Sequence, residues 1–252
     1  MDIADYDKSH YDYQTYWQNR AYENLVEHKT LSTLLPSKGT RILDLGGSFG
    51  RLMDVYAPRF EQAVIYDYSE RALQQAKESA EKQGFTNIET VQGEATHLPF
   101  DNDSFDAVIV IRVLHHLTEP NLVFSEIHRI LKPNGVCIID VPNKIHLKNR
   151  IKHLFAKDFD FASDQTPENV GTSTINGEQG IFINYHPQSI MDLLTSNGFA
   201  IQKRRSILNA RSTTLKGIFA PQFLSACDEI LQPMFTIDSL GPQIWIKAVK
   251  TL

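Results

Sequence analysis

Apolar runs rich in Val and Ile alternate with amphipathic stretches along most of the chain after position 40. In the amphipathic stretches, apolar residues recur every three or four positions, as on one face of a helix. Such alternation of strands and helices is typical of a parallel sheet with crossover helices. The sequence therefore predicts an open, twisted α/β sheet whose first five strands are Arg41–Leu45, Ala63–Asp67, Ile88–Gln92, Phe105–Ile111 and Val136–Val141.

Residues at the predicted helix ends agree with this pattern. Ser69 is a typical N-cap and Gly84 a typical stop for the helix between the second and third strands. Pro120 fits the first turn of the helix before the fifth strand, and the turn Lys132–Gly135 ends that helix. The last part of the chain predicts a helix Pro187–Asn197, a strand Phe199–Leu208 and a strand Gln243–Val249.

Three segments lie outside this alternation and are candidates for a lid. Thr15–Leu35 has the pattern of one helix, residues 143–184 form a basic amphipathic stretch followed by a polar loop, and residues 209–241 look irregular. We predict one domain over residues 1–252. Its parts are an N-terminal lid helix within 1–36, a ligand-binding core 37–142, an inserted cap 143–184, and a C-terminal part of the sheet 185–252 with a second insertion at 209–241.

Composition and charge narrow the classes of function. The chain has 25 Lys and Arg against 30 Asp and Glu, a net charge of −5, which argues against a protein that follows nucleic-acid phosphates. Its two cysteines cannot form a disulfide framework, and a reducing compartment is expected. The acidic start Met1–Asp7 is unlike a secretory signal, and no apolar stretch approaches the roughly 20 residues that span a bilayer. We expect a cytoplasmic protein without stable membrane insertion.

A glycine turn follows the first strand. Residues 44–52 run from an apolar strand through Gly46, Gly47 and Gly50 into a helix. Ligands of open parallel sheets bind at the carboxyl ends of the strands, and missing side chains let a ligand approach the backbone and the helix N–H groups. A tight strand-to-helix turn without any ligand gives the same pattern, so the turn alone leaves both interpretations open.

The second strand ends in Asp67, 23 residues after Asp44. An acidic residue at about this offset accepts hydrogen bonds from the hydroxyls of a ribose, unless it merely starts the next helix. The two turns together outline a nucleoside pocket. The spacing of Gly46, Gly47 and Gly50 does not fit G-x-G-x-x-G, so a pyrophosphate is not required.

The segment Asp44–Gly50 resembles the first motif of the class I S-adenosylmethionine-dependent methyltransferases, an acidic residue followed by alternating glycines. Gly46, Gly47 and Gly50 follow that motif, and Ser48 stands where the middle glycine is usual. The match is to the small-molecule branch that includes the ubiquinone/menaquinone-type C-methyltransferases. It implies that these residues surround the cofactor.

Further motifs occur in the order that this family shows. Asp67 matches the ribose-binding acid, Tyr68 the residue that lies against adenine, and Glu94 the acid that accepts from the adenine amino group, with Ala95 beside it in the same segment. Three more segments match the fourth strand, its exit and the approach to the fifth strand: Ser104–Val108, Ile111–Leu117 and Glu126–Gly135. The matched region covers about Arg41 to Val141.

The resemblance implies a Rossmann-like, doubly wound fold with a mainly parallel seven-stranded sheet and an antiparallel last strand. It also implies S-adenosyl-L-methionine as cofactor and S-adenosyl-L-homocysteine as product. No metal is expected, because the nine His are scattered along the sequence and neither Cys has a partner at ligand spacing. The exit Ile111–His116 lacks the Asn/Asp-Pro-Pro-aromatic motif of amino-methylating members, which favours a small-molecule acceptor over nucleic acid or protein. The alternatives are a non-catalytic S-adenosylmethionine-binding protein with a partner surface, and a nucleotide-dependent dehydrogenase that the glycine spacing disfavours.

Several residues near the predicted pocket have two interpretations. His115 and His116 are candidates for a general base that removes a proton from the acceptor, or they shape the exit of the fourth strand. Arg112 holds either the cofactor carboxylate or an anionic group of the acceptor. His186 is a candidate substrate residue, or it only starts the helix at Pro187.

Aromatic and basic residues in the lid candidates also remain open. Tyr11, Tyr13, Tyr16 and Trp17 either close over the positively charged sulfur or pack against the sheet rim. Arg20, one turn after Tyr16, is placed to reach the cofactor carboxylate. The basic stretch Lys144–Lys157 either contacts a membrane surface or an anionic acceptor, or forms a lid helix with a solvated face. The sequence indicates neither the acceptor nor the oligomeric state.

Overall fold

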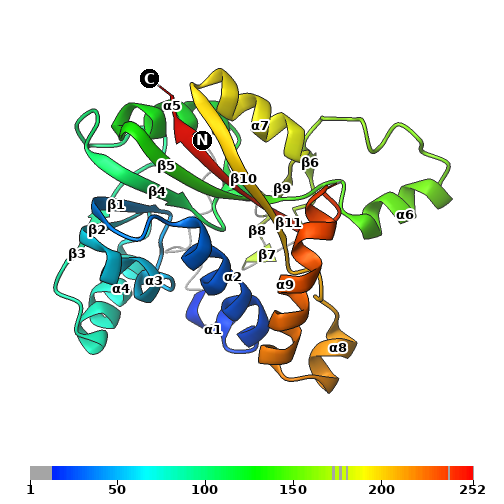
Figure 1. Cartoon of the computed structure of the whole chain (residues 1–252), viewed down its shortest axis with the longest axis horizontal. Coiled ribbons are helices and arrows are strands. Elements are labelled where there is room, and N and C mark those ends of the chain that lie inside the picture. The colour runs from blue at the N-terminus through cyan, green and yellow to red at the C-terminus, as the bar shows by residue number, and fades with distance from the viewer. Residues whose placement is uncertain (1–12, 172–173, 176–177, 180, 238, 252) are drawn as a thin grey trace.

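The computed structural model describes residues 13–171, 174–175, 178–179, 181–237 and 239–251. A seven-stranded sheet in the order β10-β11-β5-β4-β1-β2-β3 forms its centre (Figure 1). The strands from β1 to β5 pair in parallel, whereas β11 is antiparallel to both β5 and β10. This confirms the predicted fold. The strands are β1 Gly39–Leu45, β2 Phe60–Asp67, β3 Ile88–Gln92, β4 Phe105–Val110, β5 Leu131–Pro142, β10 Phe199–Ile207 and β11 Gln243–Lys250.

Apolar residues on both faces of the sheet form two separate cores. Ile42 of β1 packs in one core with side chains of helices α2 (Ala21–Leu34), α4 (Glu70–Gln83) and α9 (Pro221–Ile237). The next residue, Leu43, packs in the other core with α5 (Pro120–Ile130) and α7 (Pro187–Ser196). Because strand side chains alternate between faces, the near-continuous apolar strands are buried on both sides, as parallel sheets require.

Most helix-end signals act as the sequence predicts, but the predicted turn Lys132–Gly135 lies within β5, because α5 already ends at Ile130. The Ser69 hydroxyl accepts a hydrogen bond from Ala72 N at 3.1 Å, and Gly84 ends α4 with a left-handed φ of 76°. Pro120 lies in the first turn of α5, and α7 ends just before Gly198. These caps fix where each crossover helix begins and therefore where each strand-to-helix turn lies.

The prediction of one helix over Thr15–Leu35 is wrong, because the chain breaks into α1 (Tyr13–Trp17) and α2. A tight turn separates them, in which Arg20 N donates to Trp17 O at 3.1 Å. The break lets two aromatic side chains of α1 stack on cations. The Arg20 guanidinium lies 3.8 Å from the Tyr16 ring centroid and that of Arg51 lies 3.7 Å from Trp17.

Most of the described residues in 209–241 are helical, so the prediction that this segment is irregular is also wrong. They form α8 (Thr213–Ile218) and the long helix α9, which packs on α2 and β10. Phe223, Ile230, Met234 and Ile237 recur at helical spacing along α9, so the periodicity of a helix was present in the sequence. Pro233 lies inside this helix, although proline usually interrupts one.

The described part of the segment 143–184 contains one helix, α6 (Leu147–Phe155), and four strands of two residues each. These strands are β6 Glu168–Asn169, β7 Thr174–Ile175, β8 Glu178–Gln179 and β9 Ile183–Asn184, paired β6 with β9 and β7 with β8. The remaining short elements are α3 Met53–Tyr56 and the 3₁₀ turns Ala57–Arg59 and Leu114–His116. Within the described ranges, no helix is long and apolar enough to cross a bilayer.

Candidate functional site

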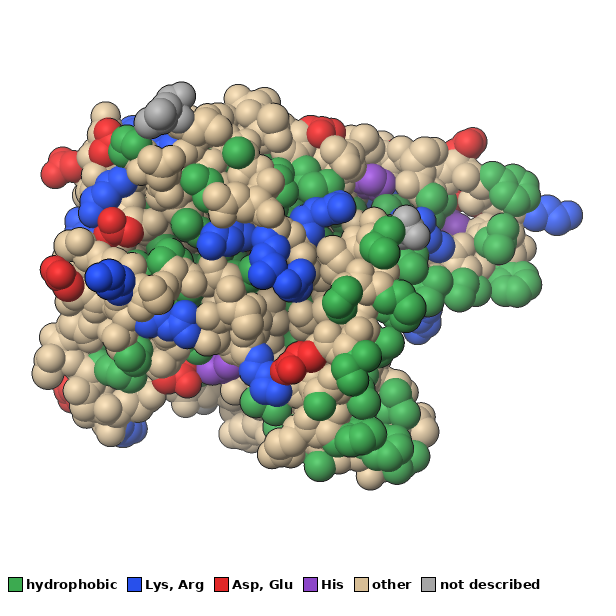
Figure 2. Space-filling view, in the orientation of Figure 1, with side chains coloured by type: hydrophobic (Ala, Val, Ile, Leu, Met, Phe, Trp, Pro, Cys, Tyr) green, Lys and Arg blue, Asp and Glu red, His purple; other side chains and the backbone are tan. Residues whose placement is uncertain are grey.

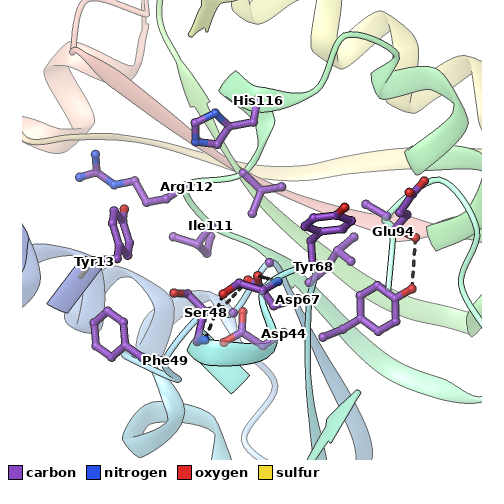
Figure 3. Close-up of a pocket in the computed structure, with 18 of the residues that line it drawn as sticks. Tyr13, Asp44, Ser48, Phe49, Asp67, Tyr68, Glu94, Ile111, Arg112 and His116 are labelled. Atoms are coloured by element: carbon purple, nitrogen blue, oxygen red, sulfur yellow. Dashed lines mark hydrogen bonds between the residues drawn. The ribbon is translucent and has the colours of Figure 1, made fainter. Parts of the chain in front are cut away.

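A cavity opens where β1, β2, β3 and β4 end, next to the point where the strand order reverses (Figure 3). Figure 3 shows Tyr13, Phe49 and Arg112 toward one end of this cavity, Tyr68 and Glu94 toward the other, and Asp67 between them. The predicted residues that line it are Trp17, Asp44, Gly46, Gly47, Ser48, Asp67, Tyr68, Glu94, Ala95, Arg112 and His116.

Glycine is required at two positions of the turn after β1. Gly46 has a φ of 72°, and a Cβ on it would lie 2.2 Å from Cγ2 of Val113. Gly50 has a φ of 73°, and its Cβ would lie 2.1 Å from Cε of Met53. Gly50 is not among the described lining residues, so it contributes to the shape of the turn and not to the cavity wall. Ser48 also has a left-handed φ, 49°, and thus keeps the backbone form that glycine would have.

Asp67 connects the turns after β1 and β2. Its Oδ2 accepts from Ser48 N at 2.8 Å and its Oδ1 accepts from Ser69 N at 2.9 Å. The two N–H groups fix the orientation of the carboxylate, which can accept up to about four hydrogen bonds. The arrangement therefore presents a pre-oriented anionic acceptor to the cavity.

Asp44 lies beneath the glycine turn and is only 3% exposed. A Cβ on Gly47 would lie 2.7 Å from its Cγ, and Tyr56 donates its hydroxyl to Asp44 Oδ2 at 3.0 Å. Burial raises the pKa of Asp44 to about 7, because it outweighs the opposing effects of Tyr56 and Arg51. The ordinary value is 3.8.

This shift gives a pH-dependent stability. Between about pH 4 and 7, folded Asp44 holds a proton that the unfolded chain has released, so its contribution to the free energy of unfolding falls as pH rises. We expect the difference in that free energy between wild type and Asp44→Asn to decrease from about pH 5 to about pH 8, measured by urea denaturation. Asp140, whose pKa burial raises to about 6, acts in the same direction but cancels in the difference. A difference that does not change with pH contradicts the expectation.

Tyr68 and Glu94 form the far end of the cavity. Tyr68 is 40% exposed, and its ring lies between Asp67 and Glu94 in Figure 3. Tyr66 supports this end from below, since its hydroxyl donates to Glu94 O at 3.2 Å. A Cβ on Gly93 would lie 1.9 Å from that hydroxyl, so the close approach of Tyr66 requires a glycine.

A buried carboxylate pairs with two arginines at the near end. Glu27 of α2 is fully buried and accepts from Arg112 Nε at 2.9 Å and from Arg51 Nη2 at 2.5 Å. The Trp17 ring covers Arg51. Burial raises the pKa of Glu27, but Arg112 and Arg51 outweigh burial and hold it below its ordinary value. The cluster therefore carries two positive charges against one negative charge next to the cavity.

Arg112 is tied to the protein on both sides. Its backbone has a φ of 64°, and its N–H donates to Asp140 Oδ1 at 2.7 Å while its guanidinium faces Glu27. Both roles predicted for Arg112, toward the cofactor carboxylate or toward an anionic acceptor, stay predictions. Either role would bring a further carboxylate to a guanidinium that Glu27 already partly neutralises.

The two adjacent histidines have different surroundings in the structure. His116 lines the cavity, and its Nδ1 lies 3.1 Å from Ile181 O. Since a carbonyl oxygen only accepts, Nδ1 carries the hydrogen and Nε2 is the basic nitrogen. Burial lowers the pKa of His116, which keeps the ring neutral at pH 7. His115 is buried between His116 and Phe182 and is not among the described lining residues.

Only some of the residues predicted to form a lid line the cavity. Tyr13 and Trp17 line the cavity, whereas Tyr16 and Arg20 lie outside its described lining. His186 caps α7, where its Nδ1 accepts from Gln188 N at 3.1 Å. Tyr11 lies outside the described residues. Of residues 143–184, the described part touches the site through the Ile181 carbonyl on His116.

Among the residues that the sequence did not single out, Phe49, Arg51 and Glu27 shape the near end of the cavity. Phe49 and Arg51 belong to the glycine turn itself, so their position was a usable signal. Glu27 belongs to no motif near the cavity, because it lies in a helix 24 residues before Arg51 and meets Arg51 only in the folded chain. A charged residue at a core-facing helical position is its only trace in the sequence.

Comparisons with known proteins point to one family. Residues 43–139 match the methyltransferase domain family model. A demethylmenaquinone methyltransferase of Clavibacter sepedonicus is 36% identical over 110 residues, and a ubiquinone/menaquinone biosynthesis C-methyltransferase UbiE of Coxiella burnetii is 33% identical over 105 residues. These alignments cover 44% and 40% of this chain and 44% and 42% of the two relatives. The chain thus spans less than half the length of the curated relatives that it matches.

The whole fold has a solved counterpart. A Thermotoga maritima structure, described as an S-adenosylmethionine-dependent methyltransferase and possible histamine N-methyltransferase, superposes with a TM-score of 0.61 at 17% identity. It covers 95% of this chain and 94% of that one. This similarity shows the fold, including the strands β10 and β11 that lie beyond the matched domain.

Proposed function

Because the chain resembles the class I S-adenosylmethionine-dependent methyltransferases in its motifs, its matched domain and its fold, we propose that it transfers a methyl group from S-adenosylmethionine to a small-molecule acceptor. The observation that carries this proposal is the convergence of Asp67, Glu94 and the glycine turn on one cavity. Two relatives named as quinone methyltransferases support a small-molecule acceptor.

The residues present fit an S-adenosyl group. Asp67 would accept from the ribose hydroxyls, Tyr68 would lie against the adenine ring, and Glu94 would accept from the adenine amino group beside Ala95. The turn from Gly46 to Ser48 would hold the amino-acid end of the cofactor, because its residues line the cavity. A ligand there can contact the backbone directly.

S-adenosylmethionine supplies a methyl group on a positively charged sulfur, which an acceptor displaces in line. The protein's part is to align the acceptor and exclude water, which recovers roughly 7–11 kcal/mol of barrier in well-oriented reactions. Tyr13 lines the near end of the cavity, where its aromatic ring would favour a cation, whereas the Trp17 ring already covers Arg51. His116 Nε2 would accept the proton that a hydroxyl or enol acceptor loses.

The first experiment is a thermal-shift titration of the full chain with S-adenosylhomocysteine. At 100 times its dissociation constant, the ligand adds about 2.7 kcal/mol, which raises the melting temperature by about 5–10 °C for a domain near this size. No shift and no heat of binding in calorimetry would contradict the proposal. Binding without methyl transfer to any member of an acceptor panel would favour the non-catalytic alternative.

A further inference from the structure

Large apolar side chains are exposed on one part of the molecule, over helices α6, α8 and α9 (Figure 2). Among the described residues, all exposed large apolar side chains except Tyr68 and Leu122 lie between Leu147 and Ile237. Soluble monomers rarely expose large contiguous apolar patches unless these bind something. The surface therefore calls for a partner.

Helix α6 has the composition of an interfacial helix. Leu147, Ile151, Leu154 and Phe155 recur at helical spacing on one face and are 39%, 46%, 58% and 84% exposed. No residue of α6 is buried, and Figure 1 shows the helix projecting from the body of the protein. A helix of this length is marginal in water when nothing packs against it.

Helices α8 and α9 extend the same surface. Ile218 is 68% exposed, and along α9 Phe223, Ile230, Met234 and Ile237 are 53%, 78%, 56% and 72% exposed. The end of α9 lies next to the start of α6, because Leu147 N donates to Leu240 O at 2.8 Å. In Figure 2 the apolar side chains follow both regions on one face of the molecule.

Basic residues border this apolar surface. Helix α6 carries Lys148, Arg150 and Lys152 and contains no Asp or Glu. On the sheet beside α9, Lys203 of β10 lies directly opposite Lys247 of β11, and Figure 2 shows Lys and Arg side chains gathered there. Like charges opposite each other on neighbouring strands are destabilising, so an anionic partner would relieve this pair.

We propose that the face formed by α6, α8 and α9, with its basic border, docks on the surface of an anionic lipid bilayer. The apolar side chains would enter the boundary between headgroups and acyl chains, and the Lys and Arg side chains would contact anionic headgroups. A two-fold contact centred on α6 would bring the basic residues of both α6 helices together. Charge complementarity therefore favours the bilayer over a second copy.

The test is flotation of the full chain with vesicles. We expect binding to vesicles of phosphatidylcholine mixed with phosphatidylglycerol, weaker binding to phosphatidylcholine alone, and loss of binding at high salt. The double variant Leu154→Ser/Phe155→Ser should bind at least about tenfold more weakly. The matched control is Leu122→Ser on α5, an apolar side chain that is 45% exposed outside this face and should leave binding unchanged.

Folding is checked separately by the melting temperature of each variant. Helix α6 contributes no described residue to the cavity, so S-adenosylhomocysteine binding should be unaffected in the double variant, whatever the acceptor is. Absence of vesicle binding, or equal binding by the double variant, would overturn the proposal. A concentration-dependent dimer that the double variant abolishes, without vesicle binding, would assign the face to contact between copies and would also overturn it.

Discussion

In the variant Asp67→Ala, S-adenosylhomocysteine should bind about 100-fold more weakly or worse than in wild type. Hydrogen bonds to a charged group contribute about 1.5–3 kcal/mol each, and a ribose offers two hydroxyls to this carboxylate. The two N–H groups of Ser48 and Ser69 already hold the carboxylate in one orientation, so little of that energy is lost in ordering it. Isothermal calorimetry on both proteins measures the ratio of dissociation constants.

The control for this variant lies on the same strand. Glu61→Ala removes an exposed carboxylate near the start of β2, at the opposite end from Asp67, and should leave binding unchanged. Asp67 also bridges two turns, so its removal can lower the stability of the protein. The melting temperature of Asp67→Ala without ligand, compared with that of wild type, shows how much of the loss of binding comes from unfolding. If folded Asp67→Ala binds the ligand as wild type does, Asp67 does not hold the ribose.

The sequence predicted those helices whose ends are marked by a single capping or helix-breaking residue. Ser69, Gly84 and Pro120 each satisfy or remove a backbone hydrogen-bonding requirement at a helix end, which is a property of the residue itself. The apolar strands were equally visible, since both of their faces are buried. The break between α1 and α2 was not visible in the sequence, and Trp17 beside it meets Arg51 only in the folded chain.

The same distinction holds in the site. Motif residues such as Asp67 and Glu94 lie at strand ends that the topology brings to one edge, so their order along the chain was sufficient. His115 and His116 are adjacent in sequence and could not be told apart until the 3₁₀ turn at Leu114–His116 placed one in the cavity and the other against Phe182.

The largest expected loss of stability belongs to Glu27→Gln. Removing one partner of a buried charge cluster costs about 3–5 kcal/mol, because Arg51 and Arg112 would both lose the carboxylate that their side chains pair with. At about 2–4 °C per kcal/mol, the melting temperature should fall by roughly 10 °C. Urea denaturation measures the change in free energy directly. The matched control is Glu229→Gln. It breaks the exposed ion pair with Lys29, which lies on α2 like Glu27, and should cost at most about 1 kcal/mol.

The pH dependence of this loss separates charge from packing. Burial raises the pKa of Glu27, but the two arginines outweigh it and lower the pKa below its ordinary value of 4.5. A carboxyl group with a lowered folded-state pKa contributes stability above its unfolded pKa and loses it as pH falls through the folded value. The difference between wild type and Glu27→Gln should therefore be full at pH 7 and should shrink in acid. A difference that stays constant as the pH falls would mean that the shape of the side chain, and not its charge, holds Arg51 and Arg112 at the cavity.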